Sequence, residues 1–150
     1  MGAPLLLRTL EGMEGGELLS KLQDHMEVSS APRLKKEDGE INWNETAREI
    51  HNKVRAFLPW PSVTVRFREV PCKILASRLT DDSDATKAQP GTILGTGNSM
   101  KVVCGGGSII ELLLVQLESR APVTGGELLN GVRIRSGEKF FSMGCKKTTM

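Results

Sequence analysis

The sequence contains two histidines and three cysteines, the side chains from which a catalytic or metal site is most often built. His51 is placed at the margin of a predicted helical face, with no Ser, Cys or acidic partner set by the sequence to orient its ring. His25 lies in a polar segment and has no better partner. Cys72, Cys104 and Cys145 are widely spaced, with no CxxC pair and no metal-ligand interval to a histidine. We therefore expect no catalytic residue, no metal ligand and a reducing compartment.

Two short runs have the composition of ligand loops but not the required context. The three glycines at 105–107 lie between two predicted strands rather than before a helix, which favours a hairpin turn over a phosphate loop. Asp81, Asp82 and Asp84 alternate like calcium ligands, yet the glycine and the terminal glutamate of a calcium loop are missing. A solvated loop is the better interpretation, and the chemistry that remains is electrostatic.

Basic side chains gather in the middle of the chain although the total formal charge is only +2. Residues 33–78 carry ten basic and six acidic side chains, whereas residues 1–32 carry two and five. If a helix and a sheet pack together here, the cations form a track suited to a nucleic-acid backbone. The interleaved acids leave a solvated surface equally open, and the low aromatic content of 4% disfavours base stacking as the main contact. The candidate nucleic-acid-binding residues are Arg33, Lys35, Lys36, Arg48, Arg55, Arg66, Arg68 and Lys73.

Two helices and a linker are predicted in the first 60 residues. Leucines recur at helical intervals over 5–13 before glycines end the pattern, and residues 25–43 are polar and rich in turn formers. A second helix is stronger: Thr46 and Glu49 have the spacing of a capping box, and apolar positions follow on one face up to Leu58. Prolines then end the helix and hold Trp60 at a corner, where we expect it to seal the core. No segment is long and apolar enough to span a membrane.

The hydrophobic period changes to two after the corner. Alternation over 63–67 predicts a half-buried strand with a basic outer face. Short apolar segments separated by glycine-rich turns follow at 72–76, 92–94, 101–104 and 108–117. Residues 124–130 have a helical pattern, and 132–134 a final extended one. Several short strands without intervening helices predict a mainly β fold with N-terminal helices, in which an amphipathic helix precedes a small antiparallel OB-like β-barrel.

Several of these segments together resemble the C-terminal domain of methionyl-tRNA formyltransferase. The matching stretches are A-P-x-L-x-K-E-D-G-x-I-x-W at 31–43, E-I-H-N-x-V-R-A at 49–56, P-W-P at 59–61, P-G-T-I-L at 90–94, V-C-G-x-G at 103–107 and L-L-N-G at 128–131. They extend over residues 31–135. The family usually has glycine after P-W-P, where this chain has Ser62. No resemblance is found after Lys139.

The resemblance implies a division of the chain and a partner. Residues 1–24 are then the terminal helix of an absent catalytic domain, 25–43 a basic linker, 44–140 the barrel domain and 141–150 a tail. The implied partner is initiator tRNA, which the linker and barrel hold while another domain transfers the formyl group from 10-formyltetrahydrofolate. The family's His-Pro-Ser-Leu-Leu-Pro motif is not found in these 150 residues, so we expect no formyl transfer from them alone.

Two alternatives to this interpretation stay open. The domain can belong to another folate-dependent formyltransferase or hydrolase, because related C-terminal domains occur there. It can also be a noncatalytic interaction module or truncation product. We expect a monomer that is able to self-associate through an exposed N-terminal helix. We expect a mitochondrion or plastid as its compartment if the source is eukaryotic, and the cytoplasm if it is bacterial.

Overall fold

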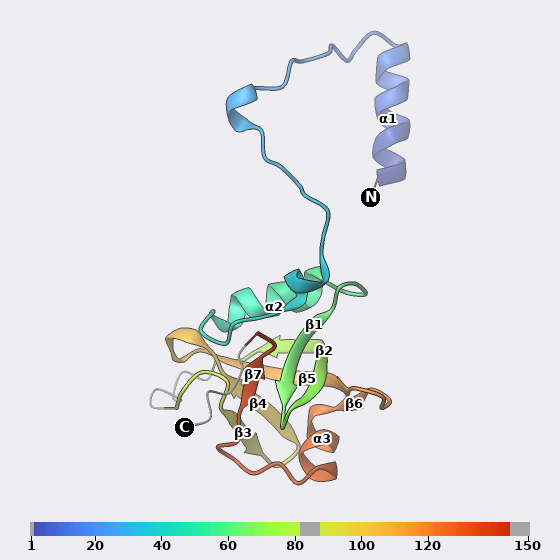
Figure 1. The fold of residues 1–150 in the computed structure, drawn as a ribbon. Helices are drawn as coiled ribbons and strands as arrows, with labels where there is room; N and C mark the ends of the chain where they lie inside the picture. Colours follow the sequence, from blue (N-terminus) through green and yellow to red (C-terminus); the bar gives the residue numbers. More distant parts are fainter. Residues whose placement is uncertain (1, 82–87, 145–150) are drawn as a thin grey trace. The chain divides into compact units, whose positions relative to one another are not determined.

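The computed structural model describes residues 2–81 and 88–144, which fall into two compact units, Met1–Arg33 and Leu34–Met150. The first unit contains helix α1 (Gly2–Glu14) and a short 3-10 turn, η1 (His25–Glu27), in the blue part of Figure 1. No side chain of α1 is buried within the unit. The predicted N-terminal helix is therefore present, and its leucines are exposed.

The second unit is a curled antiparallel sheet, which confirms the predicted fold class (Figure 1). Along the sheet the strand order is β3-β4-β5-β2-β1-β7, and β6 pairs with β5. The strands are β1 (Val63–Phe67), β2 (Val70–Leu79), β3 (Ile93–Thr96), β4 (Ser99–Val103), β5 (Ile109–Leu117), β6 (Val123–Thr124) and β7 (Phe140–Ser142). Strand β5 bends around the sheet, since its register with β2 shifts near Ala76.

Backbone hydrogen bonds link the two ends of this strand order. Thr92 and Lys139 form an antiparallel bridge beside β3 and β7. The Ile93 amide donates to the Glu138 carbonyl at 2.7 Å, and the Phe140 amide to the Gly91 carbonyl at 2.9 Å. The sheet is thus a curled half-barrel, and these few bonds join the segments beside β3 and β7 at its two ends. This shape is in keeping with the expected OB-like barrel.

Helix α2 (Ala47–Ala56) lies across one end of the sheet, and α3 (Gly125–Gly131) lies at the other (Figure 1). The predicted capping box is present, because the Thr46 hydroxyl accepts from the Glu49 amide while a Glu49 carboxylate oxygen accepts from the Thr46 amide at 2.8 Å. Ala47, Ile50 and Val54 form its buried face. The amphipathic pattern therefore fixes which side of α2 contacts the core.

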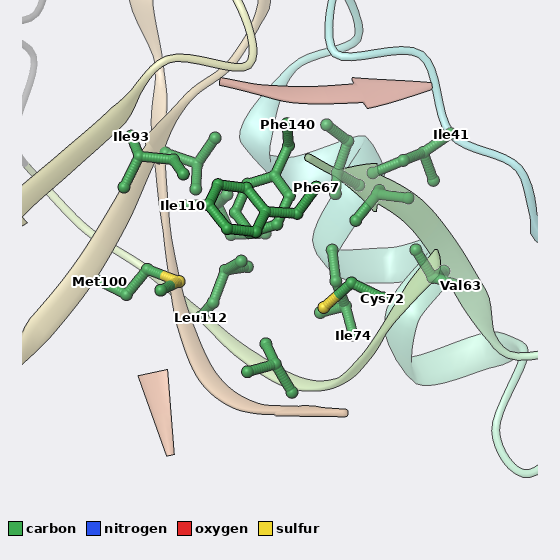
Figure 2. Packing of buried hydrophobic residues seen from close by; sticks show 14 of the residues in the cluster. Ile41, Val63, Phe67, Cys72, Ile74, Ile93, Met100, Ile110, Leu112 and Phe140 are labelled. Carbon is green, nitrogen blue, oxygen red and sulfur yellow. The ribbon is translucent and has the colours of Figure 1, made fainter. Parts of the chain in front are cut away.

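The core lies inside the curl and is shown in Figure 2. The ring centroids of Phe67 and Phe140 lie 5.4 Å apart, and Met100 and Leu112 of the paired strands β4 and β5 belong to the same buried cluster. The strand residues that alternate inward on β1 are fully buried, with exposed fractions of 3% or less. This alternation leaves the other face of β1 and β2 available for polar side chains.

The structure differs from expectation before and after the P-W-P corner. Residues 34–43 belong to the barrel unit rather than to a linker, because Ile41 and Trp43 are buried in its core. Trp43 stacks on Phe140 with ring centroids 5.9 Å apart. Trp60 is 55% exposed and does not seal the core, so that expectation was wrong. Ser62, not the indole, is the buried residue of the corner, and its φ of 65° explains why glycine suits this position.

The last strand also lies later than predicted. Residues 132–134 are not a strand, because Val132 caps α3 and Arg133 adopts a positive φ that turns the chain. The strand that completes the sheet is β7, which pairs with β1 and crosses the boundary expected at residue 140. The buried side chain of Phe140 was not recognised as a core position, because the run from Lys139 carries no clear alternation.

Candidate nucleic-acid interface

Lys35 and Lys36 are positioned by a 3-10 turn, η2 (Lys36–Gly39), that packs on the barrel unit. The Asp38 carboxylate accepts from the Lys35 amide at 2.7 Å and closes the turn. A Cβ added at Gly39 would lie 2.2 Å from the Ser62 carbonyl, so glycine is needed for this close approach. The turn therefore lies against the connection between α2 and β1, and both lysine side chains are exposed.

The outer face of β1 and β2 continues from this turn. Glu40 forms a parallel bridge with Thr64, and Thr64 is opposite Lys73 in the β1–β2 register. Lys73 is exposed and Arg66 half-buried, because their neighbours in sequence point into the core. The backbone thus places the η2 lysines, Arg66 and Lys73 on adjacent segments.

Arg48 and Arg55 lie on the exposed side of α2. They are seven residues apart, or about 10 Å along the helix axis at 1.5 Å per residue. Arg55 is in the last turn, near the connection that contacts η2, whereas Arg48 is in the first turn. Arg48 also lines a cavity with Thr80, Gly106 and other residues of the β2 and β5 ends.

Two of the predicted arginines make contacts within the fold. Arg66 donates to the Met143 carbonyl at 3.1 Å and lies 3.5 Å from the Glu69 carboxylate. Arg68 donates two hydrogen bonds to the Glu138 carboxylate. These bonds raise the pKa of Arg68 and lower the pKa of Glu138. The guanidinium of Arg68 also lies 4.9 Å from the centre of the Phe67 ring. These two arginines therefore support the β1–β2 hairpin as well as contributing positive charge.

The structure brings seven of the eight predicted cations into one unit. Arg33 is the last residue of the first unit and is exposed. Residues 33–78 also carry six acidic side chains. Two of these lie near cations: Glu45 is paired with Lys53 at 2.7 Å, and Glu69 lies 3.5 Å from Arg66. The candidate interface thus includes acidic as well as basic side chains.

His51 has a partner that the sequence did not indicate. Its Nδ1 lies 2.9 Å from the Ser77 hydroxyl, across the contact between α2 and β2. A serine beside a histidine is the core of a nucleophile–base pair. Ser77, however, lies in mid-strand opposite Leu112, where its backbone is part of the ladder. The pair joins the helix to the sheet, and only the tertiary packing of α2 reveals it.

Two of the three cysteines, Cys72 and Cys104, lie within the described residues, and both are buried. Burial raises the pKa of both the Cys72 and the Cys104 thiol to about 12, so both are neutral at physiological pH. Cys145, Asp82 and Asp84 lie outside the described residues. Within 2–81 and 88–144, no three His, Cys, Asp or Glu side chains gather closely enough to hold a metal ion. Nor does any helix in these ranges have the length and apolar character needed to cross a membrane.

Comparison with known proteins gives a consistent result. The family model described as formyl transferase, C-terminal domain, matches residues 33–133. Methionyl-tRNA formyltransferase of Solibacter usitatus is 40% identical over 139 residues, which are 93% of this chain and 43% of that protein. The protein of the same name from Koribacter versatilis is 37% identical over 139 residues, again 43% of its length. The chain therefore spans less than half the length of these curated relatives.

Solved structures show a similar fold. HypX from Aquifex aeolicus, in a variant with six alanine substitutions, superposes with a TM-score of 0.60 at 14% identity, over 89% of this chain and 24% of that chain. The same protein in complex with tetrahydrofolic acid gives a TM-score of 0.58 at the same identity and the same coverage of this chain. At this identity the likeness concerns the fold alone.

Proposed function

Because the chain belongs to the formyl transferase C-terminal domain family, we propose that it is the tRNA-binding part of a methionyl-tRNA formyltransferase. In this proposal it holds initiator tRNA through the sugar-phosphate backbone. The formyl donor of the whole enzyme, 10-formyltetrahydrofolate, is then bound by the part of the relatives that this chain does not match. No folate contact is assigned to the described residues.

The observation that carries the proposal is the arrangement of exposed cations on connected backbone segments. The η2 turn, which follows Lys35 and includes Lys36, lies against Ser62 in the connection between α2 and β1. Arg55 is exposed in the last turn of α2, and the Glu40–Thr64 bridge leads on to Lys73. Such side chains contact phosphates without reading base sequence. Double-stranded RNA is recognised largely in this way, through shape and backbone. The low aromatic content agrees with this mode.

The proposal is tested by filter binding of initiator tRNA to the 150-residue chain. The variant Lys35→Ala/Lys36→Ala/Arg55→Ala removes three cations of the surface, and we expect a loss of affinity of about tenfold or more. Arg133→Ala is the matched control, because Arg133 is exposed, follows α3 and is not one of the eight predicted cations.

The triple variant should weaken binding of all RNAs about equally, since phosphate contacts carry no sequence information. Binding that survives the triple substitution, or that Arg133→Ala weakens as strongly per charge removed, would overturn the assignment of this surface. A loss confined to one tRNA would contradict backbone recognition.

A further inference from the structure

The outer face of the sheet carries a row of three polar side chains on neighbouring strands. Thr64 of β1 is opposite Lys73 of β2, and Lys73 is opposite Gln116 of β5. Residues that are opposite each other on neighbouring strands share a face of the sheet, with their Cβ atoms about 5 Å apart. The sequence neighbours of Lys73, Cys72 and Ile74, are buried, so the row points away from the core. The backbone register thus sets the three side chains next to one another.

A groove of about 190 Å³ lies along this row. Its lining consists of the three residues of the row, Pro71, and Leu117, Glu118 and Ser119 at the end of β5. The Glu118 amide donates to the Pro71 carbonyl at 2.9 Å, which holds the end of β5 against β2. Sites for whole small molecules have volumes of about 300–1,000 Å³. This groove is smaller, so it suits one part of a larger molecule.

The polar groups of the row are available to a ligand. None of the three residues is buried, since Lys73 is exposed and Thr64 and Gln116 are half-buried. Within 2–81 and 88–144, neither the Thr64 hydroxyl nor the Lys73 ammonium has a hydrogen-bond or ion-pair partner. Two arginines of the β1–β2 hairpin, by contrast, contact carboxylates. Gln116 Nε2 donates to the Arg120 carbonyl at 2.8 Å, which orients the side chain and leaves Oε1 as an open acceptor.

The groove offers donors and acceptors together. Lys73 donates, Gln116 Oε1 and the Glu118 carboxylate accept, and the Thr64 hydroxyl can do either. A phosphate only accepts, so by itself it would leave the acceptors unpaired and would be repelled by Glu118. A sugar hydroxyl both donates and accepts, and in RNA it lies beside a phosphate. The shallow minor groove of an RNA helix presents these 2′-hydroxyls.

We propose that this groove receives the ribose of one nucleotide of the bound RNA. Gln116 Oε1 accepts from the 2′-hydroxyl, the Thr64 hydroxyl donates to the 2′-oxygen, and Lys73 contacts the adjoining phosphate. The inference rests on the proposed RNA-binding function and adds a property to it, because the 2′-hydroxyl is the group that distinguishes RNA from DNA. Phosphates are common to both nucleic acids, so contacts to phosphates alone do not make that distinction.

The test compares initiator tRNA with a 2′-O-methyl version of the same sequence, in filter binding to the 150-residue chain. The methylated RNA keeps every phosphate, but its 2′-oxygen no longer donates. We expect the wild type to bind the unmodified tRNA about tenfold more tightly. Thr64→Val and Gln116→Leu should each weaken binding of the unmodified tRNA about three- to tenfold, as expected for one lost hydrogen bond, and should change binding of the methylated RNA little. The preference for the unmodified tRNA then shrinks.

Two controls separate this contact from the phosphate contacts. Asn130→Leu removes an exposed amide that does not line the groove, and it should keep the preference of the wild type. The salt dependence of binding should stay the same in Thr64→Val and Gln116→Leu, because neither substitution removes a charge. Lys73→Ala should make the salt dependence shallower.

Each outcome decides between the proposals. If the wild type binds both RNAs equally and in a salt-sensitive way, the ribose inference is wrong and the backbone proposal stands. A preference that Thr64→Val and Gln116→Leu both leave unaltered would also overturn the inference. If neither RNA binds, the proposed function fails and the inference with it. Should Gln116→Leu disrupt the turn after β5, Thr64→Val still decides the question, because valine suits a strand and replaces only the hydroxyl.

Discussion

Arg68, directly after β1, and Glu138, just before β7, face each other through two hydrogen bonds. Nε lies 2.8 Å from one carboxylate oxygen and Nη2 lies 2.7 Å from the other. Arg68 Nη1 also donates to the Val132 carbonyl at 3.0 Å. The pair joins the β1–β2 turn to the segment that leads into the last strand, so it helps to hold β7 in the sheet.

This geometry predicts that Arg68 contributes to folding more than to RNA binding. Arg68→Ala should lower the urea midpoint, because the bidentate contact and the bond to Val132 are lost together. Arg68→Lys should restore only part of it, since an ammonium group cannot form the same two parallel bonds. The measurement is equilibrium unfolding followed by circular dichroism. An unchanged midpoint for Arg68→Ala, with a large loss of tRNA affinity, would reverse this assignment.

Glu111 predicts how stability depends on pH. Its residue is 7% exposed, and its carboxylate accepts from the Ser99 hydroxyl at 2.7 Å and from Arg78 at 2.6 Å. These bonds lower the pKa of Glu111, and the hydrogen bond from Ser99 has a larger effect than the bonds from Arg78. The folded state therefore binds the proton less readily than the unfolded state. The resulting stability is complete above the unfolded pKa and is lost as the pH falls through the folded pKa.

We expect Glu111→Gln to lower the free energy of unfolding at pH 7 by about 1–2 kcal/mol, because a charged hydrogen-bond acceptor is lost. Below the folded pKa of Glu111 the variant and wild type should become nearly equal. Urea unfolding at several pH values measures both effects. A difference between variant and wild type that is the same at acidic and neutral pH would contradict the role given to the carboxylate.

The glycine run between β4 and β5 predicts a contrast between two neighbouring positions. A Cβ at Gly105 would lie 1.8 Å from the Asn44 carbonyl, whereas one at Gly106 would meet nothing within 4 Å. Gly105→Ala should lower the free energy of unfolding by about 3 kcal/mol or more, because the backbone around Asn44 must move to make room for the methyl group. Gly106→Ala should cost only about 1–2 kcal/mol, for its φ of 66°. Thermal unfolding compares the two, and equal losses would show that close packing is not what selects glycine at 105.

Helix α1 predicts self-association of the chain. Leu6 and Leu10 are 60% and 52% exposed, one helical turn apart. Exposed apolar faces of this kind favour contacts between molecules. Size-exclusion chromatography should show concentration-dependent early elution of the wild type and not of Leu6→Ser/Leu10→Ser. Identical monomeric elution of both proteins at all concentrations would exclude this role of α1.

Local patterns were sufficient to predict several elements of this fold. The capping box at Thr46, the alternation of β1 and the stop signals around the glycines depend on neighbouring residues only. The contribution of Trp43 and Phe140 to the core was missed for the opposite reason. Each side chain is buried against residues that are far away in sequence, and a local sequence pattern does not indicate such contacts.

The candidate site shows the same division. Residue type alone selected the candidate cations. Lys35, Lys36 and Lys73 among them are exposed, and their contact with RNA stays a prediction. The hydrogen bonds between Arg68 and Glu138 and the contact between His51 and Ser77 both join segments that are distant in sequence. These features required the tertiary structure.

The salt dependence of initiator tRNA binding tests the central claim most directly, namely that exposed cations on η2, α2 and the β1–β2 face hold the RNA backbone. The logarithm of the association constant should fall linearly with the logarithm of the salt concentration. Each of Lys35→Ala, Lys36→Ala and Lys73→Ala should reduce the steepness of that line by about one unit. An affinity that does not change with salt, or a slope that these substitutions leave unaltered, would contradict it.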